Sequence, residues 1–174
     1  MRLAQVWAAT FRREPMTEAN RFSARIHWTG NRGAGTAHYR AYDRNWRIAV
    51  PGKAPIDCSN DPALGGDRAR MNPEDLLLSA LAGCHMLWYL HLAAEAGLRV
   101  LAYTDQPEGR GETAPDGAGR FVEVLLNPCA TVPEGTDLHR AASLHGEVHR
   151  FCYIARSLAC PVRVAPRFRV APTR

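Results

Sequence analysis

An apolar segment over residues 72–96 constrains the fold of this chain more than any other feature. Asn72 is a good N-cap, Pro73 suits the first helical turn, and Gly97 can serve as the C-terminal cap. Leucines surround this predicted helix on all sides instead of forming one stripe along it. A helix of that kind is either buried inside a protein or spans a membrane.

Polar residues in the segment favour the buried helix. Glu74 and Asp75 lie in its first turn, and Ser79 and His85 lie farther along it. The chain has no second segment of this length and hydrophobicity. The sequence therefore predicts a central core helix over residues 73–96 and no membrane association.

The composition is that of a globular chain, with 46% hydrophobic and 22% charged residues among 174. The formal net charge of +5 comes from basic residues spread along the whole chain, so we expect no nucleic-acid partner. The five cysteines form no CxxC pair, and no apolar signal sequence precedes them. We therefore expect reduced thiols and a cytoplasmic location. Residues 1–15 are predicted to be an N-terminal extension, and residues 16–174 one domain.

The remaining segments indicate an α+β fold. Alternating or β-rich patterns predict strands, and the pattern of apolar residues at helical spacing predicts a second helix over residues 137–158. The predicted strands cover residues 22–28, 36–42, 46–50, 100–103, 120–132, 162–164 and 168–170, with a long loop at 51–70 and a glycine-rich connection at 108–119.

Two cysteines occupy notable positions. Cys84 lies about three turns into the central helix, directly after Gly83, whose missing side chain leaves room beside the sulfur. Cys152 falls on the apolar stripe of the second predicted helix. Composition alone describes both as small core residues, and a thiol in the middle of a helix needs a nearby cation to ionise.

The residues around these cysteines carry a family resemblance. Residues 72–77 read Asn-Pro-Glu-Asp-Leu-Leu, and Cys84 follows ten residues after the glutamate. Residues 152–158 read Cys-Tyr-Ile-Ala-Arg-Ser-Leu and lead into the last predicted strands. The two motifs resemble the two cysteine signatures of the OsmC/Ohr family of organic hydroperoxide reductases, over roughly residues 22–170. The resemblance implies an OsmC-like fold, in which both helices pack against curved antiparallel sheets. Because a single chain would leave its all-apolar helix poorly covered, we also expect an intertwined homodimer with the helices at its centre.

The resemblance also implies a chemistry, that of a thiol peroxidase without metal, haem or another cofactor. In it, Cys84 attacks an organic hydroperoxide as a thiolate and becomes a sulfenic acid. Cys152 then condenses with it as the resolving thiol and forms a disulfide. A dithiol reductant, a lipoylated protein in the Ohr branch of the family, returns both thiols.

The same resemblance implies an arginine near the thiolate, oriented by the carboxylate of Glu74. Arg32 matches the hairpin arginine of the Ohr branch. Other branches supply the arginine from the loop before the helix, where Arg68 and Arg70 are the candidates. Glu74 lies about 15 Å from Cys84 along the helix axis, so it acts on the sulfur only through such an intermediary.

Several alternatives stay open. His85 follows Cys84 where the family commonly has an aromatic or aliphatic residue, Tyr153 replaces the usual proline after Cys152, and Cys160 is a third thiol that can compete as the resolving one. A non-catalytic OsmC-like protein that binds a small apolar ligand is one alternative function. A metal site is another, with four histidines on the two predicted helices: His85, His91, His145 and His149.

Overall fold

The structure is a computed structural model that describes residues 21–172. The chain divides into two compact units, Met1–Cys58 and Ser59–Arg174, each with its own β-structure. The extension predicted for residues 1–15 lies outside the described residues.

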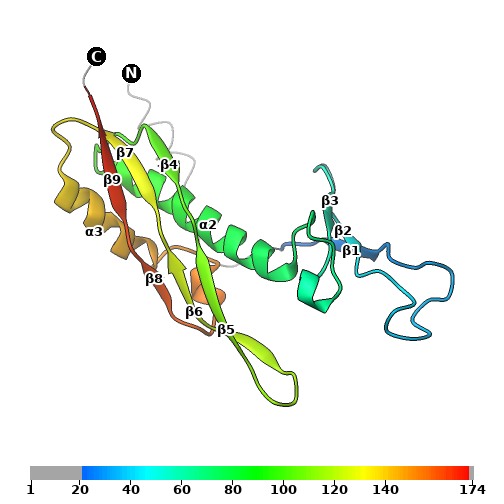
Figure 1. Ribbon diagram of the computed structural model, residues 1–174. Coiled ribbons are helices and arrows are strands. Elements are labelled where there is room, and N and C mark those ends of the chain that lie inside the picture. The colour runs from blue at the N-terminus through cyan, green and yellow to red at the C-terminus, as the bar shows by residue number, and fades with distance from the viewer. Residues whose placement is uncertain (1–20, 173–174) are drawn as a thin grey trace. The chain divides into compact units, whose positions relative to one another are not determined.

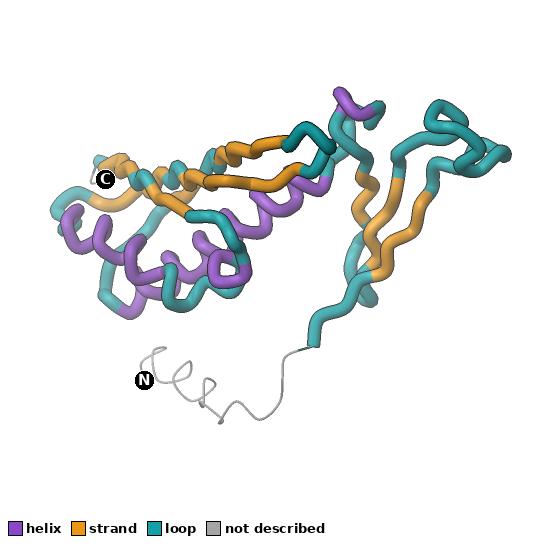
Figure 2. The backbone as a smooth tube through the Cα atoms, turned by 90° about the horizontal axis from the view of Figure 1, so that it is seen from below, coloured by secondary structure: helices purple, strands orange, loops and turns teal. Residues whose placement is uncertain are grey.

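The described part of the first unit is built on a three-stranded antiparallel sheet. Its strands are β1 (Arg25–Trp28), β2 (Trp46–Ala49) and β3 (Ile56–Cys58), in the order β1-β2-β3 (Figure 2). Trp28 pairs with Trp46, and Trp46 pairs with Cys58, so β2 is the central strand.

Three predictions for this unit need correction. The returning strand expected at residues 36–42 does not form, and a single bridge between Asn31 and Tyr42 takes its place. β3 lies inside the segment predicted as a loop. The residues of β1 are all exposed instead of alternating between buried and exposed. Residues 29–44 contain several glycines and polar side chains that bond to nearby backbone, and such local bonds compete with strand pairing.

The predicted central helix is confirmed as α2 (Pro73–Glu95), in the second unit (Figure 1). The Asn72 side chain accepts the backbone N–H of Asp75 at 2.7 Å, and the Asp75 carboxylate accepts the N–H of Asn72 at 3.1 Å. This reciprocal capping box satisfies donors that the first turn leaves open and fixes where the helix begins.

Only part of the α2 surface is covered within its own unit. The buried residues are mainly one stripe at four-residue spacing, namely Leu81, His85, Tyr89 and Ala93. Leu87, on another face, is 65% exposed. Within residues 21–172, α2 is the one helix whose length and hydropathy suffice for a membrane span, a test that core helices of soluble proteins also pass.

Two three-stranded sheets cover the helices of the second unit. They contain β4 (Ala102–Thr104), β7 (Cys129–Pro133) and β9 (Arg167–Ala171) in one, and β5 (Glu108–Thr113), β6 (Gly119–Leu126) and β8 (Val162–Val164) in the other. Each strand of one sheet leads directly into a strand of the other: β4 into β5, β6 into β7 and β8 into β9. The joined strands therefore lie in the same order in both sheets, β4-β7-β9 and β5-β6-β8. Each continuation contains a proline: Pro107, Pro128 and Pro166.

Hydrogen bonds hold the two sheets together across these breaks. The N–H of Asn127 donates to the Asp105 carboxylate at 2.8 Å, and the N–H of Ala165 donates to the Leu126 carbonyl at 2.9 Å. The pair therefore forms one layer that bends where proline removes a ladder donor. This bend is the curvature that the sequence predicted, and Figure 2 shows both helices on one side of the strands.

The sheets differ from the prediction in two ways. They are mixed, because β8 runs parallel to β6 and β9 runs parallel to β7, and only β4–β7 and β5–β6 are antiparallel. The segment expected to be a glycine-rich connection contains β5. A Cβ at Gly109 would lie 2.3 Å from the Phe121 ring, so this ring on β6 occupies the space that the glycine leaves open.

The second helix, α3 (Leu138–Val148), is shorter than predicted. Asp137 caps it by accepting the N–H of Arg140 at 2.9 Å. After Val148 the chain tightens into a turn, and the N–H groups of both Phe151 and Cys152 donate to the Val148 carbonyl. Cys152 therefore lies in a turn beyond the helix, and the prediction that placed it on the helix was wrong.

Candidate active site

The structure brings Cys84 and Cys152 together in the second unit. Cys84 lies in the middle of α2, and Cys152 lies in the turn between α3 and the short 3-10 helix η2 (Ala155–Ser157). The Cys84 side chain lies close enough to the Cys152 thiol to raise its pKa, and the Cys152 sulfur accepts the backbone N–H of Ala155 at 3.4 Å. Both cysteines are reduced and pack in the same hydrophobic core, so a disulfide between them requires only that the two sulfurs move together.

The two thiols differ in burial, and therefore in how readily they ionise and react. Cys152 is fully buried, whereas Cys84 is half-buried. Burial raises the pKa of the Cys152 thiol to about 11, with a further contribution from the neighbouring Cys84 thiol. Cys152 is therefore a protonated thiol near neutral pH, and Cys84 is the sulfur of the pair that is open to molecules from solution.

Gly83 leaves open space beside Cys84, as the sequence predicted. A Cβ added at Gly83 would meet no atom within 4 Å among the neighbours that the structure describes. The α2 surface at Gly83, next to Cys84 in the chain, is therefore uncovered within the second unit. A substrate or another protein surface has room to approach it there.

Glu74 lies in the first turn of α2 and is exposed. Ten helical residues place it about 15 Å from Cys84 along the axis, so its carboxylate does not reach the sulfur. Within residues 21–172 the Glu74 side chain has no ion pair. An orienting role toward an arginine stays a prediction.

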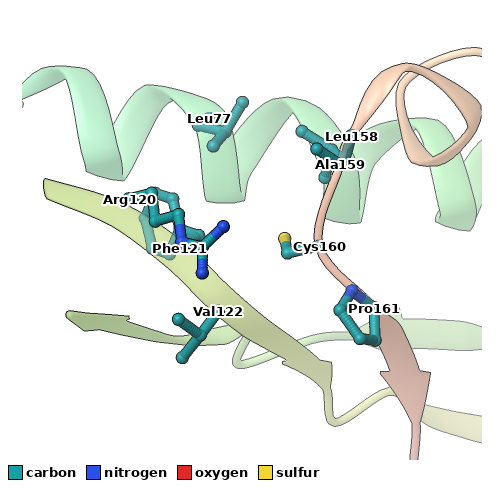
Figure 3. Close-up of a pocket in the computed structure, with 8 residues that line it drawn as sticks. All are labelled: Leu77, Arg120, Phe121, Val122, Leu158, Ala159, Cys160 and Pro161. Carbon is teal, nitrogen blue, oxygen red and sulfur yellow. The ribbon is translucent and has the colours of Figure 1, made fainter.

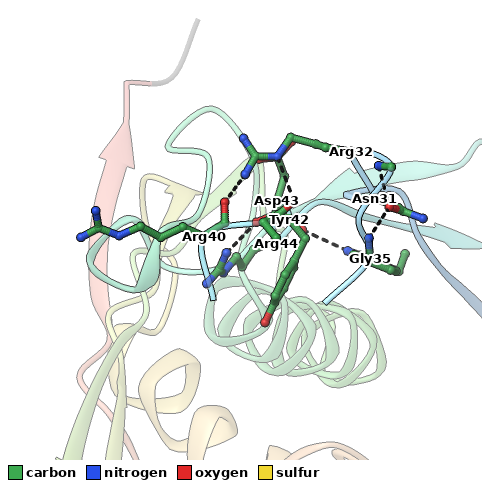
Figure 4. Close-up of polar contacts among 10 residues, drawn as sticks. Asn31, Arg32, Gly35, Arg40, Tyr42, Asp43 and Arg44 are labelled. Atoms are coloured by element: carbon green, nitrogen blue, oxygen red, sulfur yellow. Dashed lines mark hydrogen bonds and ion pairs between the residues drawn. The ribbon is translucent and has the colours of Figure 1, made fainter. Parts of the chain in front are cut away.

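Arg32 belongs to the first unit, where it holds its own loop together. Its guanidinium donates to the carbonyl of Ala41 at 3.3 Å and to the carbonyl of Arg40, and it lies 3.7 Å from the Asp43 carboxylate (Figure 4). Asn31 closes the start of the same loop by accepting the N–H groups of Gly33 and Gly35. These contacts give Arg32 a structural role, and its pairing with Cys84 stays a prediction.

The two alternative arginines lie in the loop before α2. Arg70 is paired with Asp67 at 3.1 Å, and Arg68 is exposed. Neither makes a hydrogen bond to Cys84 or Cys152 among the described residues. Their roles also stay predictions.

A further arginine, Arg120, was not singled out in the sequence. It lines a cavity of about 390 Å³ together with Leu77 of α2 and with Cys160 (Figure 3). In Figure 3 the Cys160 sulfur faces this cavity from the segment that leads into β8. Arg120 donates to Glu112 at 2.7 Å, which orients its guanidinium along the strand pair. The Cys160 thiol thus lies at this cavity, whereas Cys152 is the cysteine whose thiol lies near Cys84.

Sequence reasoning also missed a buried histidine pair. His85 Nε2 and His145 Nδ1 lie 2.9 Å apart between α2 and α3, within hydrogen-bond distance. The sequence named both as candidate metal ligands, but no group of three or more His, Cys, Asp or Glu side chains in the described part of the chain could hold a metal ion. The spacing of His85 from Leu81 and Tyr89, four residues to either side, was the available signal that it faces the core.

Comparisons with known proteins agree with this fold. An OsmC-like protein of unknown function from Vibrio cholerae is 26% identical, with a TM-score of 0.76, and the match covers 85% of this chain and 99% of that one. An organic hydroperoxide resistance protein from Legionella pneumophila is 19% identical, with a TM-score of 0.64 and coverage of 87% and 98%. Another from Elizabethkingia anophelis, with thiocyanate bound, is 16% identical, with a TM-score of 0.65 and coverage of 90% and 100%.

The sequence itself also matches a family model. No curated protein sequence gives a significant match to this chain. The model described as OsmC-like protein matches residues 65–167, which include α2, Cys84, Cys152 and strands β4 to β8 of the second unit. The chain therefore belongs to the OsmC-like protein family.

Proposed function

We propose that this protein reduces organic hydroperoxides with Cys84 and Cys152 as its redox pair. The observation that carries the proposal is that the half-buried Cys84 thiol and the fully buried Cys152 thiol lie near one another in one hydrophobic core. Two of the solved structures with this fold are named organic hydroperoxide resistance proteins. The apolar residues around α2 favour alkyl hydroperoxides over hydrogen peroxide.

The proposed cycle uses the two thiols in sequence. The Cys84 thiolate gives an electron pair to the terminal peroxide oxygen, the O–O bond breaks, and the alkoxide takes a proton and leaves as the alcohol. The Cys152 thiol then attacks the sulfenic sulfur of Cys84, so that an S–S bond forms and water leaves. A dithiol reductant, for which a lipoylated protein is our candidate, returns both thiols and is itself oxidised to a disulfide.

Thiol counting tests the proposal directly. The reduced protein has five free cysteines. One equivalent of cumene hydroperoxide should leave three thiols that react with a disulfide reagent in denaturant, and peptide mapping should find one bond between Cys84 and Cys152. Hydrogen peroxide at the same concentration should react more slowly.

Five remaining thiols would indicate the non-catalytic binding protein. A bond between Cys84 and Cys160 would assign the resolving role to the third thiol.

We also propose that the protein works as a homodimer in the cytoplasm. Apolar side chains of both units are exposed, among them Ile26 and Trp28 of β1 and Leu87 of α2. Free thiols suit a reducing compartment. A second copy is the partner that covers such surfaces most simply in a symmetric protein.

Light scattering after size exclusion should give twice the chain mass of 19.2 kDa at micromolar concentration. The variant Leu87→Glu should shift the protein toward the monomer, because a charge would then enter the apolar interface. A wild-type protein that stays monomeric at this concentration contradicts the proposed dimer.

A further inference from the structure

A pair of stacked aromatic rings joins α2 to the turn that contains Cys152. The Trp88 ring on α2 and the Phe151 ring in the turn have centroids 5.0 Å apart, and their planes differ by 24°. Both side chains are half-buried. An aromatic pair at this separation stabilises the contact beyond the apolar area that it buries. The stack is therefore a specific contact between two elements that are far apart in the sequence.

The two rings lie directly next to the two cysteines in the chain. Trp88 follows Cys84 by four residues on α2, and this spacing places both side chains on one face of the helix. Phe151 immediately precedes Cys152. Contact between the rings therefore holds the part of α2 that contains Cys84 against the backbone that contains Cys152.

Other contacts restrict the positions of both rings. The His91 ring lies 5.5 Å from the Trp88 ring at an angle of 82°, an edge-to-face arrangement. The Arg150 guanidinium lies 5.5 Å from the centre of the Phe151 ring, within the range of a cation–π interaction. The N–H of Phe151 also donates to the Val148 carbonyl at 2.9 Å, which fixes the turn to the end of α3.

The hydrogen bonds of Cys152 do not fix its position relative to α2. Its N–H donates to the Val148 carbonyl, and its sulfur accepts the N–H of Ala155. Both partners lie within four residues of Cys152, so these bonds set only the local shape of the turn. The distance from the turn to α2 depends on side-chain packing, and the stack of Trp88 on Phe151 is the part of that packing next to both cysteines.

We propose that Trp88 and Phe151 are positioning residues, whose stacked rings hold Cys152 ready to attack Cys84. The proposal rests on the proposed function for the step that it affects. In that step the Cys152 thiol attacks the sulfenic sulfur, the S–S bond forms as the S–O bond breaks, and the thiol proton leaves with the hydroxide as water. A group held near its target reacts faster than one on a turn that moves freely. The earlier attack of Cys84 on the peroxide does not involve the turn.

Substitution of the ring in the turn separates these two steps. Phe151→Leu keeps an apolar side chain but removes the stack, so formation of the disulfide should slow about tenfold, the upper end of what an aromatic pair contributes. Reduced protein receives one equivalent of cumene hydroperoxide, and rapid quenching follows the loss of peroxide and the formation of the Cys84–Cys152 disulfide separately. The loss of peroxide should keep the wild-type rate. Phe151→Tyr keeps a stacked ring and should form the disulfide as fast as the wild type.

A matched control removes a ring from the other neighbour of Cys152. The Tyr153 side chain is 60% exposed, and Tyr153→Leu should leave both rates unchanged.

A second measurement uses no peroxide. The reduced protein is equilibrated with mixtures of reduced and oxidised glutathione, in which the two cysteines form their disulfide as one glutathione disulfide is reduced to two thiols. The effective concentration of one thiol at the other should be about tenfold lower in Phe151→Leu than in the wild type. If the wild type forms the disulfide here but not with peroxide, the proposed function fails, and the comparison of these variants in glutathione still decides the positioning role.

Three results overturn the proposal. The first is equal disulfide formation in the wild type and in Phe151→Leu, both after peroxide and in glutathione. The second is a Phe151→Tyr variant as slow as Phe151→Leu, because the ring would then not be the cause. The third is slower loss of peroxide in Phe151→Leu, which would place the rings beside the substrate instead. If Phe151→Leu does not fold, Trp88→Leu and the ring-retaining Trp88→Phe make the same comparison from α2.

Discussion

Replacing Cys84 by serine is expected to lower the rate of alkyl hydroperoxide reduction about a thousandfold or more. The reaction needs a polarisable sulfur that accepts oxygen, and a serine hydroxyl is neither ionised near neutral pH nor oxidised by peroxide. The substitution changes one atom at a half-buried position and should leave the fold intact. The measurement is peroxide consumption with a dithiol reductant in excess, together with the circular dichroism spectrum of the variant.

Two further cysteine variants show whether the loss is specific. Cys152→Ser should still consume one equivalent of peroxide and stop at the Cys84 sulfenic acid, which a sulfenic-acid reagent then traps. Cys129→Ser, at a half-buried cysteine on β7, is the matched control and should keep wild-type turnover. Full activity of Cys84→Ser contradicts the proposed mechanism. Continued turnover of Cys152→Ser removes Cys152 from the resolving role.

The parts of the fold that follow local rules were predictable from the sequence. The start of α2 is fixed by Asn72, Pro73 and Asp75, whose capping interactions involve only neighbours in the chain. Its burial, by contrast, depends on what packs against it. The sequence indicated an apolar helix on all sides, whereas its own unit covers mainly the stripe that includes Leu81 and Tyr89.

The elements that were predicted incorrectly depend on residues far away in the sequence. β5 has glycine and charged residues that disfavour strands, yet it forms because β6 offers it a complete antiparallel edge and places Phe121 over Gly109. The parallel pairing of β8 with β6 joins residues that are far apart in the chain, such as Val124 and Val162. Apolar spacing continued past Val148, so periodicity alone extended the second helix to Leu158. The backbone instead turns after Val148, and Phe151 stacks on Trp88.

In the candidate site, too, local sequence motifs predicted one pair of residues and missed the other. The cysteine pair was found because each thiol stands in a recognisable local motif, and the structure places both thiols in one hydrophobic core. The histidine pair has no motif, since 60 residues separate its members. The metal-site hypothesis placed His145 and His149 together on one predicted helix, but His85, the ring within hydrogen-bond distance of His145, is on the other helix.

Stability should fall steeply as the pH drops below about 6.5, because of the histidine pair. In the unfolded chain both imidazoles have pKa values near the ordinary 6.5, whereas burial in the folded protein lowers the pKa of His85 to about 4 and that of His145 to about 3. Above pH 6.5 both states hold neutral rings, so these groups give no pH dependence. Between about 6.5 and 4 the unfolded chain binds protons that the folded chain refuses, so the free energy of unfolding decreases as the pH falls.

The expected decrease in the free energy of unfolding is large for two side chains. Each proton taken up only by the unfolded state costs about 1.4 kcal/mol per pH unit, so lowering the pH from 7 to 5 should remove on the order of 3 kcal/mol of stability. The measurement is urea unfolding of the reduced protein at both pH values. Other groups also titrate, including Asp105, whose carboxyl pKa is raised by burial and which therefore acts in the opposite direction.

A double variant isolates the contribution of the pair. Replacing both His85 and His145 by phenylalanine keeps two stacked rings between α2 and α3 and removes all four imidazole nitrogens, so neither polar partner is left unpaired. Asp105 remains in both proteins, so its effect cancels in the difference between their unfolding free energies. The double variant should be less sensitive to acid than the wild type by on the order of 3 kcal/mol between pH 7 and 5. An equal pH dependence in the two proteins would mean that the histidines take up protons in the folded state as well, and that the interface between α2 and α3 opens to water far more readily than the buried contact of His85 with His145 implies.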